Sequence, residues 1–546
     1  MSGWRRGVPA WAAPGLVIVL LTATVTWPQG FHLSTRIAAH NDALFSIWRL
    51  AWVAQGLATD PRHLFDANIF HPAANTLSFS DAMLLQGVLA APLFWAGVSP
   101  ILIYNVLLVG GIALSGFAMF VLARHVTGSH RAALVSGVIF TVAPYRIEHF
   151  MHLELQWAMW MPLAFWAIHR TFETRAWRFG LLAGLFVWLQ LLSSVYYGVF
   201  LAAACVALVL LLSATRPGDA LGALPTLVAG GIVAAMGAAP YAWPYLQAAR
   251  TMARTPAEVA AYSATWWSYL ASPPQSLLWS WTSSLGGPEL RLFPGAVAIL
   301  LALTAVLLRP RRIVAVYAVL ALVAIDLSLG SNGYTYSWLL DRVDVLHGLR
   351  APARFGIIAC SAVAILAGFG AQAVEERLRA AGSRAAVSMA EALTILVAID
   401  GATSGMWIMN APYQPASVFN VYKSIRALGP GPVLELPLPR LDALPGHEAT
   451  FMLWSTAHWH PLVNGYSGYY PHEYSQTVSR IERFPDDQSI AQLTNIGVRY
   501  IVVHRVYYDE QEYGALIEKM DARPELRSQG TYDDPLGECH LFVLGH

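Results

Sequence analysis

Long runs of apolar residues, separated by short segments that carry arginines, fill the sequence up to about residue 411. Hydrophobic residues make up 56% and charged residues only 12% of the 546 residues, whereas about a quarter of a soluble chain is charged. A bilayer core needs about 20 apolar residues per helix. About eleven runs are read as spans, several of them short because their ends grade into aromatic interfacial residues: 14–30, 100–123, 132–143, 155–168, 179–192, 199–212, 221–241, 292–308, 313–330, 355–374 and 387–409. The sequence therefore predicts a mostly α-helical, polytopic membrane protein.

The net charge argues against nucleic-acid binding, and the positions of the cysteines argue against a disulfide or a cysteine metal site. The formal net charge is +1, which provides no basic surface for a nucleic-acid backbone. Cys205 and Cys360 lie in apolar runs and Cys539 lies near the C-terminus, so no disulfide or metal cluster is indicated. Arg5 and Arg6 precede the first apolar run as in a signal peptide, but no small-residue cleavage site follows. We expect an uncleaved first helix.

The arginines between the apolar runs predict an orientation in the membrane. Basic residues concentrate in short cytoplasmic loops, and they cluster here at 124–131, 170–178, 216, 309–312 and 377–384. All these clusters face the cytoplasm if the run 83–98, which Pro92 interrupts, lies in the interface or re-enters instead of crossing. A crossing at 83–98 would turn the later basic loops outward. On the first interpretation the protein is a multi-pass cell-membrane protein with a cytoplasmic N-terminus and an extracytoplasmic C-terminus.

The segments that then face outward are longer and richer in histidine, acidic and aromatic residues than the inward loops: 31–100, 144–154, 246–290 and 331–354. After residue 412 the apolar runs give way to prolines, charges and short alternating patterns. These patterns predict strands at 433–436, 499–503 and 540–544 and helices at 489–495 and 510–519. We therefore expect a transmembrane domain over 1–411, with a long first outer loop, and a small α/β extracytoplasmic domain over 412–546.

Asp42 is the candidate catalytic residue. It follows the first apolar run and precedes Leu44, Trp48 and Trp52, which recur at helical spacing and favour an interfacial helix. A carboxylate at the start of such a helix, beside the membrane, is suited to act as a base on a lipid-linked substrate. The alternative is that Asn41 or Asp42 only caps the helix.

The segment 144–156 carries more polar groups than a lipid-facing turn needs. The candidates for substrate binding in it are Arg146, Glu148, His149, His152 and Glu154. His149, His152 and Glu154 also offer metal ligands, but their spacing matches no specific motif, so we assign no metal ligand. A hydrogen-bonded structural turn is the other interpretation.

Arg350 and Arg354 lie four residues apart at an outer boundary, where the distribution of basic residues would not place them. Guanidinium groups bind phosphate oxygens bidentately, so a lipid-carrier phosphate is a candidate ligand. Snorkelling to lipid headgroups is the alternative.

Aromatic residues of the other outward segments are further candidates for substrate binding. Tyr196, Tyr197, Tyr262 and Trp266 could stack on a sugar or line a groove for an isoprenoid; an interfacial aromatic belt or helix packing would use the same residues. Asp326 and Asp400 lie within or near apolar runs. A proton-coupled transporter would need carboxylates at such positions, so these two residues motivate the transporter alternative.

The sequence resembles the GT-C class of integral-membrane glycosyltransferases. The similarity lies in the first apolar run followed by a long loop with the early acidic motif His40-Asn41-Asp42, the inward turn Leu122-Ala123-Arg124 and the exit Pro144-Tyr145-Arg146. It is best over 14–212. The paired acidic motif of many members is reduced here to Asn41-Asp42.

This resemblance implies transfer of a sugar from a polyprenyl-phosphate-type carrier to a lipid, glycan or protein acceptor on the outer face, usually with inversion. Asp42 would take the proton from the acceptor hydroxyl, and Arg350 or Arg354 would stabilise the departing phosphate. A divalent cation, Mg²⁺ or Mn²⁺, is compatible with the class, although the reduced acidic motif argues against it. The competing hypotheses are a transporter or flippase for a lipid-linked saccharide and a non-catalytic envelope assembly protein.

Overall fold

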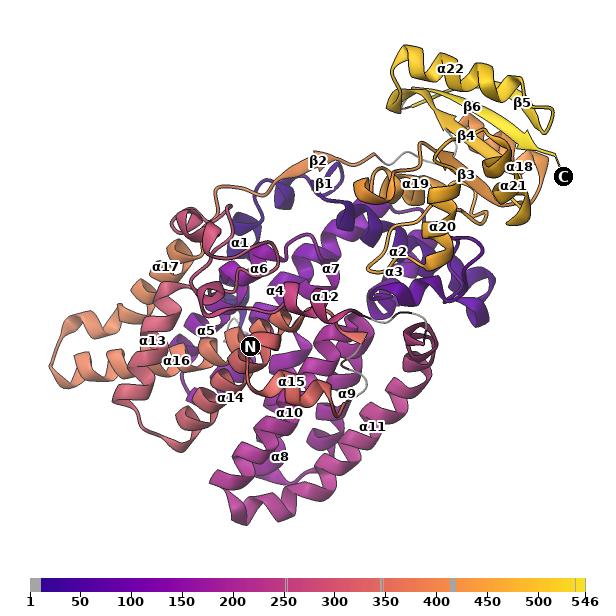
Figure 1. Cartoon of the computed structure of the whole chain (residues 1–546). Helices are drawn as coiled ribbons and strands as arrows, with labels where there is room; N and C mark the ends of the chain where they lie inside the picture. The colour runs from indigo at the N-terminus through magenta and orange to yellow at the C-terminus, as the bar shows by residue number, and fades with distance from the viewer. Residues whose placement is uncertain are drawn as a thin grey trace, which may run out of the picture. The chain divides into compact units, whose positions relative to one another are not determined.

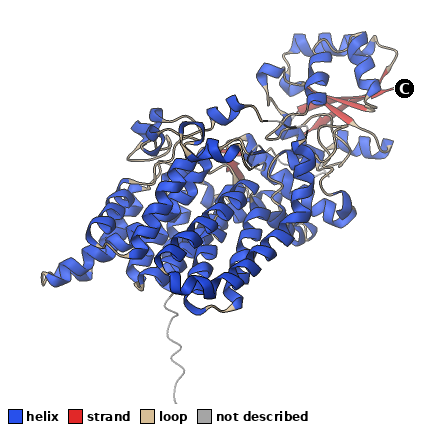
Figure 2. Ribbon diagram, turned by 60° about the horizontal axis from the view of Figure 1, so that its bottom comes forward, coloured by secondary structure: helices blue, strands red, loops and turns tan. Residues whose placement is uncertain are grey.

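A computed structural model describes residues 11–250, 252, 254–343, 346, 348–412, 419–535 and 537–545. Within these residues the chain is mostly helical, and the strands β3 (Val433–Leu436) to β6 (Gly537–Leu544) form a sheet near the C-terminus (Figures 1 and 2). Contacts divide the chain into two compact units. The helical unit comprises Met1–Ala38, Asn105–Trp243 and Ala253–Ile408, and the mixed unit comprises Ala39–Tyr104, Pro244–Met252 and Met409–His546. The domain limits expected from composition, 1–411 and 412–546, stay a prediction.

Each apolar run of the sequence forms a helix. These helices are α1 (Ala12–Val25), α4 (Pro100–Thr127), α5 (His130–Val142), α8 (Trp160–Thr174), α9 (Trp177–Ser193), α10 (Val195–Thr215), α11 (Pro217–Ala249), α13 (Ala296–Leu308), α14 (Arg312–Ser328), α16 (Gly356–Ala380) and α17 (Met389–Asp400). Short helices α6 (Pro144–Glu148), α7 (Leu153–Gln156), α12 (Pro256–Ala261) and α15 (Thr335–Leu340) connect them. The run 155–168 is divided between α7 and α8.

Four helical stretches among the described residues are long and apolar enough to cross a bilayer: α4, α10, α11 and 352–380, which joins the 3₁₀ turn η8 (Pro352–Phe355) to α16. In the last stretch 83% of the most apolar window is buried, against 17% in α11. The stretch 352–380 is therefore the helical centre, whereas α11 exposes apolar side chains as a lipid-facing helix does. These helices indicate a membrane protein; the count of about eleven crossings and the cytoplasmic N-terminus stay predictions.

The central helix α16 packs against α5, α13 and α14. A Cβ atom at Gly370 would lie only 1.9 Å from the backbone oxygen of Leu301, so α16 and α13 approach this closely because residue 370 has no side chain.

The mixed unit combines helices with a four-stranded sheet. Its helices are α2 (Asn41–Thr59), α3 (Leu84–Trp95), α18 (Asn420–Leu428), α19 (Glu448–Ser455), α20 (His472–Arg480), α21 (Asp487–Asn495) and α22 (Glu510–Asp521). The sheet has the order β3 (Val433–Leu436), β4 (Tyr500–His504), β6 (Gly537–Leu544), β5 (Leu526–Asp534), with β3 parallel to β4 and the other pairs antiparallel. The α/β character predicted for the C-terminal region is confirmed, and β5 and α18–α20 are additional.

Both faces of the central strands are buried. Leu434, Ile501 and Phe542 pack into the core on one face. Glu435 follows Leu434 in β3, and His504 lies three positions after Ile501 in β4. Both are buried, and Glu435 Oε2 is 2.7 Å from His504 Nε2. Alternating side chains point to opposite faces of a strand, so this polar pair belongs to the second face.

Most of the run 83–98 forms the short helix α3. Its 12 residues extend over about 18 Å, less than the thickness of a bilayer core of about 30 Å. The non-crossing interpretation stays a prediction.

Candidate active site

Three segments of the helical unit that are far apart in sequence carry the predicted polar residues to one place. They are 144–156, the loop 286–294 before α13, and 350–355. Proline occupies the first turn of both α6 and η8, where its fixed φ favours the start of a helix and its missing N–H leaves no bond unmade. The Tyr145 N–H donates to the Phe293 carbonyl at 3.3 Å and links the first two segments.

Two ion pairs, each with one buried and one half-buried partner, form the framework of this cluster. Glu289 Oε2 accepts hydrogen bonds from Arg354 Nε at 3.0 Å and Nη2 at 2.8 Å. Both oxygens of Glu148 lie 3.1 Å from Arg291 Nη1, and Glu148 Oε1 also accepts from the Glu289 N–H at 2.9 Å. Each carboxylate is thus held by an arginine, and that of Glu148 is held by the backbone of Glu289 as well.

The environments of the two carboxyl groups differ in their effect on pKa. Burial raises the pKa of Glu289, but Arg354 and the neighbouring histidines lower it more, to about 2. Burial dominates at Glu148 and raises its pKa despite the contact with Arg291. Glu289 is therefore a permanent anion at neutral pH.

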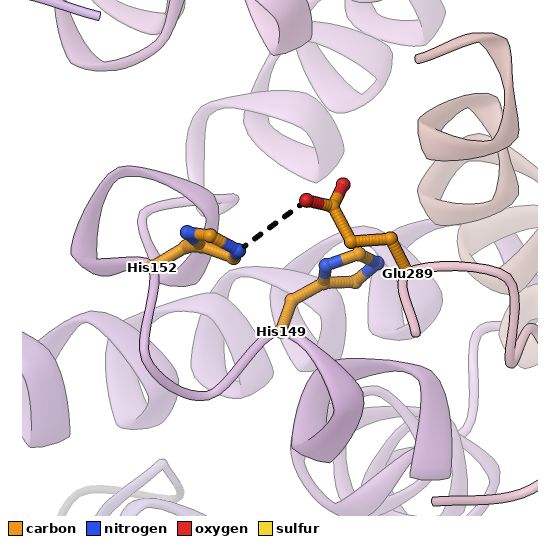
Figure 3. A group of neighbouring side chains, drawn as sticks. All are labelled: His149, His152 and Glu289. Atoms are coloured by element: carbon orange, nitrogen blue, oxygen red, sulfur yellow. Dashed lines mark ion pairs between the residues drawn. The ribbon is translucent and has the colours of Figure 1, made fainter. Parts of the chain in front are cut away.

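His149 and His152 face Glu289 (Figure 3). His152 Nε2 is 3.8 Å from Glu289 Oε1, and the candidate ligand atoms of the three residues lie within 4.8 Å of one another. Both ring nitrogens of His149 are buried and have no hydrogen-bond partner among the described residues. Burial lowers the pKa of His149 to about 3, so its imidazole is neutral and has a donor and an acceptor to offer to a ligand.

Tyrosine side chains contact the segment 350–355, which carries Arg350 and Arg354. The Tyr196 hydroxyl accepts the Arg350 N–H at 3.1 Å, and the Arg354 guanidinium lies over the Tyr196 ring at 4.8 Å. The Tyr145 and Tyr197 hydroxyls are 3.1 Å apart. The Arg350 guanidinium lies over a further ring, that of Tyr262, at 5.0 Å.

Three predicted residues take other positions. Arg146 donates to the side chain and the backbone carbonyl of Gln156, which closes the 146–156 turn. Trp266, in the 3₁₀ turn η4 (Trp266–Tyr269), is 67% exposed. Glu154 is buried in α7, and the carboxylate grouped with His149 and His152 as candidate metal ligands is that of Glu289, remote in sequence.

Asp42 lies in the mixed unit, in the first turn of α2. The N-cap is His40, whose Nδ1 accepts the Asp42 N–H at 3.2 Å. The alternative interpretation, that Asn41 or Asp42 caps the helix, is therefore wrong, and the Asp42 carboxylate makes other contacts.

One of these contacts comes from a residue that is remote in sequence. The Tyr466 hydroxyl donates to Asp42 Oδ1 at 2.8 Å, and His40 Nδ1 is 3.2 Å from Oδ2. The Phe45 ring packs edge-on against Tyr466 at 5.4 Å. No pattern in the sequence marked Tyr466, Glu289 or Arg291, since each acts through a contact across hundreds or scores of residues.

His149, His152 and Glu289 lie close enough together to bind a divalent cation, but the charges around them disfavour one. Two imidazoles and one carboxylate are ligands for a transition metal more than for Mg²⁺. Arg354 already occupies one oxygen of Glu289, Arg291 is paired with Glu148, and Arg350 adds a further positive charge. The balance of charge favours an anion over a dication.

Asp326 and Asp400 have structural partners. Asp326 accepts the N–H groups of Tyr334 and Thr335, each at 3.0 Å. Asp400 accepts from Trp279 Nε1 at 2.8 Å and from the Val297 N–H at 3.0 Å. These bonds give both carboxylates a role in fixing turns and helix starts, so they do not require a transport function.

Comparison with solved structures finds membrane glycosyltransferases. An oligosaccharyltransferase of Archaeoglobus fulgidus in the apo form has 12% sequence identity and a TM-score of 0.52, over 93% of this chain and 71% of that one. The arabinofuranosyltransferase AftD from Mycobacteria has 13% identity and a TM-score of 0.60, over 98% of this chain and 41% of that one. No protein-family model and no curated protein sequence matches the chain. The similarity in structure shows that the chain has the fold of these transferases.

Proposed function

We propose that this chain, with its GT-C fold, transfers a sugar from a polyprenyl-phosphate-type lipid carrier to an acceptor hydroxyl at the outer face of the membrane. The observation that supports this most is the cluster of Arg350, Arg354, His149 and His152, brought together from separate segments with excess positive charge. An enzyme of this kind must hold the carrier phosphate while the bond to the sugar breaks.

We propose different roles for the two arginines. Both arginines have partners among the described residues; Arg354 binds Glu289 and lies over the Tyr196 ring, and we assign it to fixing the cluster. We assign Arg350 to the departing phosphate, whose charge its guanidinium would stabilise. The neutral, buried His149 would add a hydrogen bond to a phosphate oxygen.

Asp42 is proposed as the general base. An alcohol is a weak nucleophile, and a positioned carboxylate that takes its proton contributes typically about 10²-fold to 10⁴-fold. The structure supports this role in that His40, not Asp42, caps α2, and Tyr466 fixes one oxygen of the carboxylate. Inversion at the anomeric carbon follows if Asp42 activates the acceptor directly.

The test is mass spectrometry of envelope glycans from a strain that lacks the gene, complemented with wild type or with variants. We expect wild type to restore one glycosylated product and Asp42→Asn to lose it, while the protein remains inserted. Asp60→Asn is the matched control, since Asp60 lies in the same unit and is exposed, with His63 as its partner. Full restoration by Asp42→Asn would disprove the base assignment.

A further inference from the structure

A cavity of about 390 Å³ lies where α13 ends, α14 begins and α16 ends, remote in sequence from the cluster around Glu289. Its lining includes Leu308, Arg309, Arg311, Glu376 and Arg377. Three guanidinium groups and one carboxylate leave positive charge in excess. The cavity is therefore suited to an anion.

Arg309 is the buried member of this set. Its side chain is 7% exposed, and Nη2 donates to Glu376 Oε1 at 2.8 Å. Nη1 is also buried and has no hydrogen-bond partner among the described residues. A buried guanidinium with an unused donor is costly unless a ligand or water takes it up.

The start of α14 adds a second source of positive potential. This helix of 17 residues begins at Arg312, next to the cavity residue Arg311. The first N–H groups of a helix have no intrahelical acceptor, and the helix dipole favours negative charge there. Phosphate groups bind at such helix starts.

An exposed apolar stripe leads away from the cavity along α13. Leu300, Leu303 and Leu307 are 64%, 53% and 76% exposed and, at spacings of three and four, lie on one face of the helix. Leu308, the next residue, lines the cavity. A molecule with a phosphate in the cavity would have this surface available for acyl chains.

We propose that this cavity binds the phosphate of an anionic phospholipid, whose acyl chains lie along the exposed leucines of α13. The chemistry that the arginines recognise is the phosphate group, which a lipid headgroup and free inorganic phosphate share. The leucine stripe favours the lipid. This site is independent of the proposed transferase function.

Native mass spectrometry of the detergent-solubilised full chain tests the proposal, with dioleoylphosphatidylglycerol and dioleoylphosphatidylcholine as probes. We expect phosphatidylglycerol to bind at least about 25-fold more tightly, because each of Arg311 and Arg377 gains about fivefold in affinity from an anionic headgroup. Arg311→Gln with Arg377→Gln should weaken phosphatidylglycerol binding about 25-fold, about fivefold for each charge removed, and leave phosphatidylcholine binding unchanged. Arg309 is kept because its loss would leave Glu376 unpaired.

Arg178→Gln with Arg384→Gln is the matched control, since it removes two exposed arginines that do not line the cavity. Equal losses in the two double variants, or equal binding of the two lipids to wild type, would overturn the proposal. Inorganic phosphate that displaces phosphatidylglycerol at equal concentration would also overturn it and assign the cavity to a free anion. If the double variant does not fold, Arg377→Gln alone should still weaken phosphatidylglycerol binding about fivefold.

Discussion

At the scale of single residues, the Tyr466 hydroxyl fixes one oxygen of the Asp42 carboxylate within the mixed unit. Tyr466 donates to Oδ1, and His40 Nδ1 lies beside Oδ2. A hydrogen bond donated to a carboxylate favours its ionised form and restricts its orientation. We regard Tyr466 as a positioning residue for the proposed base.

Tyr466→Phe removes only this hydroxyl and keeps the ring against Phe45. A hydrogen bond to a charged group contributes about 1.5–3 kcal/mol, so we expect kcat to fall about tenfold or more with KM nearly unchanged. The acid limb of the pH–rate profile should move to higher pH, since Asp42 loses a bond that favours its ionised form. Initial rates of sugar transfer against pH measure both effects. Tyr469→Phe, in the same loop, is the control, and unchanged kcat and pH profile in Tyr466→Phe would contradict the role.

The charge around His149 and Glu289 gives a second prediction at this scale. Because the cluster already carries an excess of guanidinium groups, we expect activity to survive removal of metal ions. Transfer assayed after dialysis against EDTA should keep at least about half its rate, since the substrate phosphate is bound here by arginines. A loss that Mn²⁺ or Mg²⁺ restores, with the metal bound to wild type and not to Glu289→Gln, would show instead that the cluster holds a cation.

At the scale of elements, α19 anchors the loop that carries Tyr466. Glu448, in the first turn of α19, is fully buried and accepts the Gly465 N–H at 2.6 Å and the Asn464 side-chain amide at 3.1 Å. Burial raises its pKa to about 8, against these hydrogen bonds, which lower it. The residue before Tyr466 is thus fixed by a carboxyl group that titrates near neutral pH.

This raised pKa predicts a dependence of stability on pH. Between about pH 4.5 and pH 8 the folded protein keeps a proton on Glu448 that the unfolded chain releases, so the contribution of this group to stability falls as pH rises. Thermal unfolding of wild type and Glu448→Gln in detergent, followed from pH 5 to pH 8, measures it. We expect the midpoint of wild type to fall relative to that of the variant over this range. A constant difference would contradict the assignment.

Elements also show where sequence patterns succeed. The apolar runs and the strands β3, β4 and β6 were predictable, because burial leaves a continuous apolar signal. The strand β5 was not, because Leu526 is its only buried residue and the rest is polar edge. The short helices α6 and α7 carry the candidate residues, but their length gives no periodic signal.

At the scale of the whole molecule, the predicted orientation can be tested by labelling. In a variant that lacks Cys205, Cys360 and Cys539, Ser129→Cys should react with a membrane-impermeant maleimide only after the cells are opened, since the arginines nearby predict a cytoplasmic loop. Ser284→Cys, on the expected outer face, should react in intact cells and serves as the control. The reverse pattern would invert the topology and place the arginine cluster on the cytoplasmic side.

The sequence by itself determined the class of protein, the apolar helices and the small C-terminal sheet, because these follow from hydrophobicity and local periodicity, which act over neighbouring residues. It also marked Asp42, His149, His152, Arg350 and Arg354 as unusual polar groups beside apolar runs. Only the tertiary structure decided their partners: Glu289 for Arg354, Tyr466 for Asp42 and Gln156 for Arg146. Packing of remote segments sets such contacts, and no local pattern records which segments will meet.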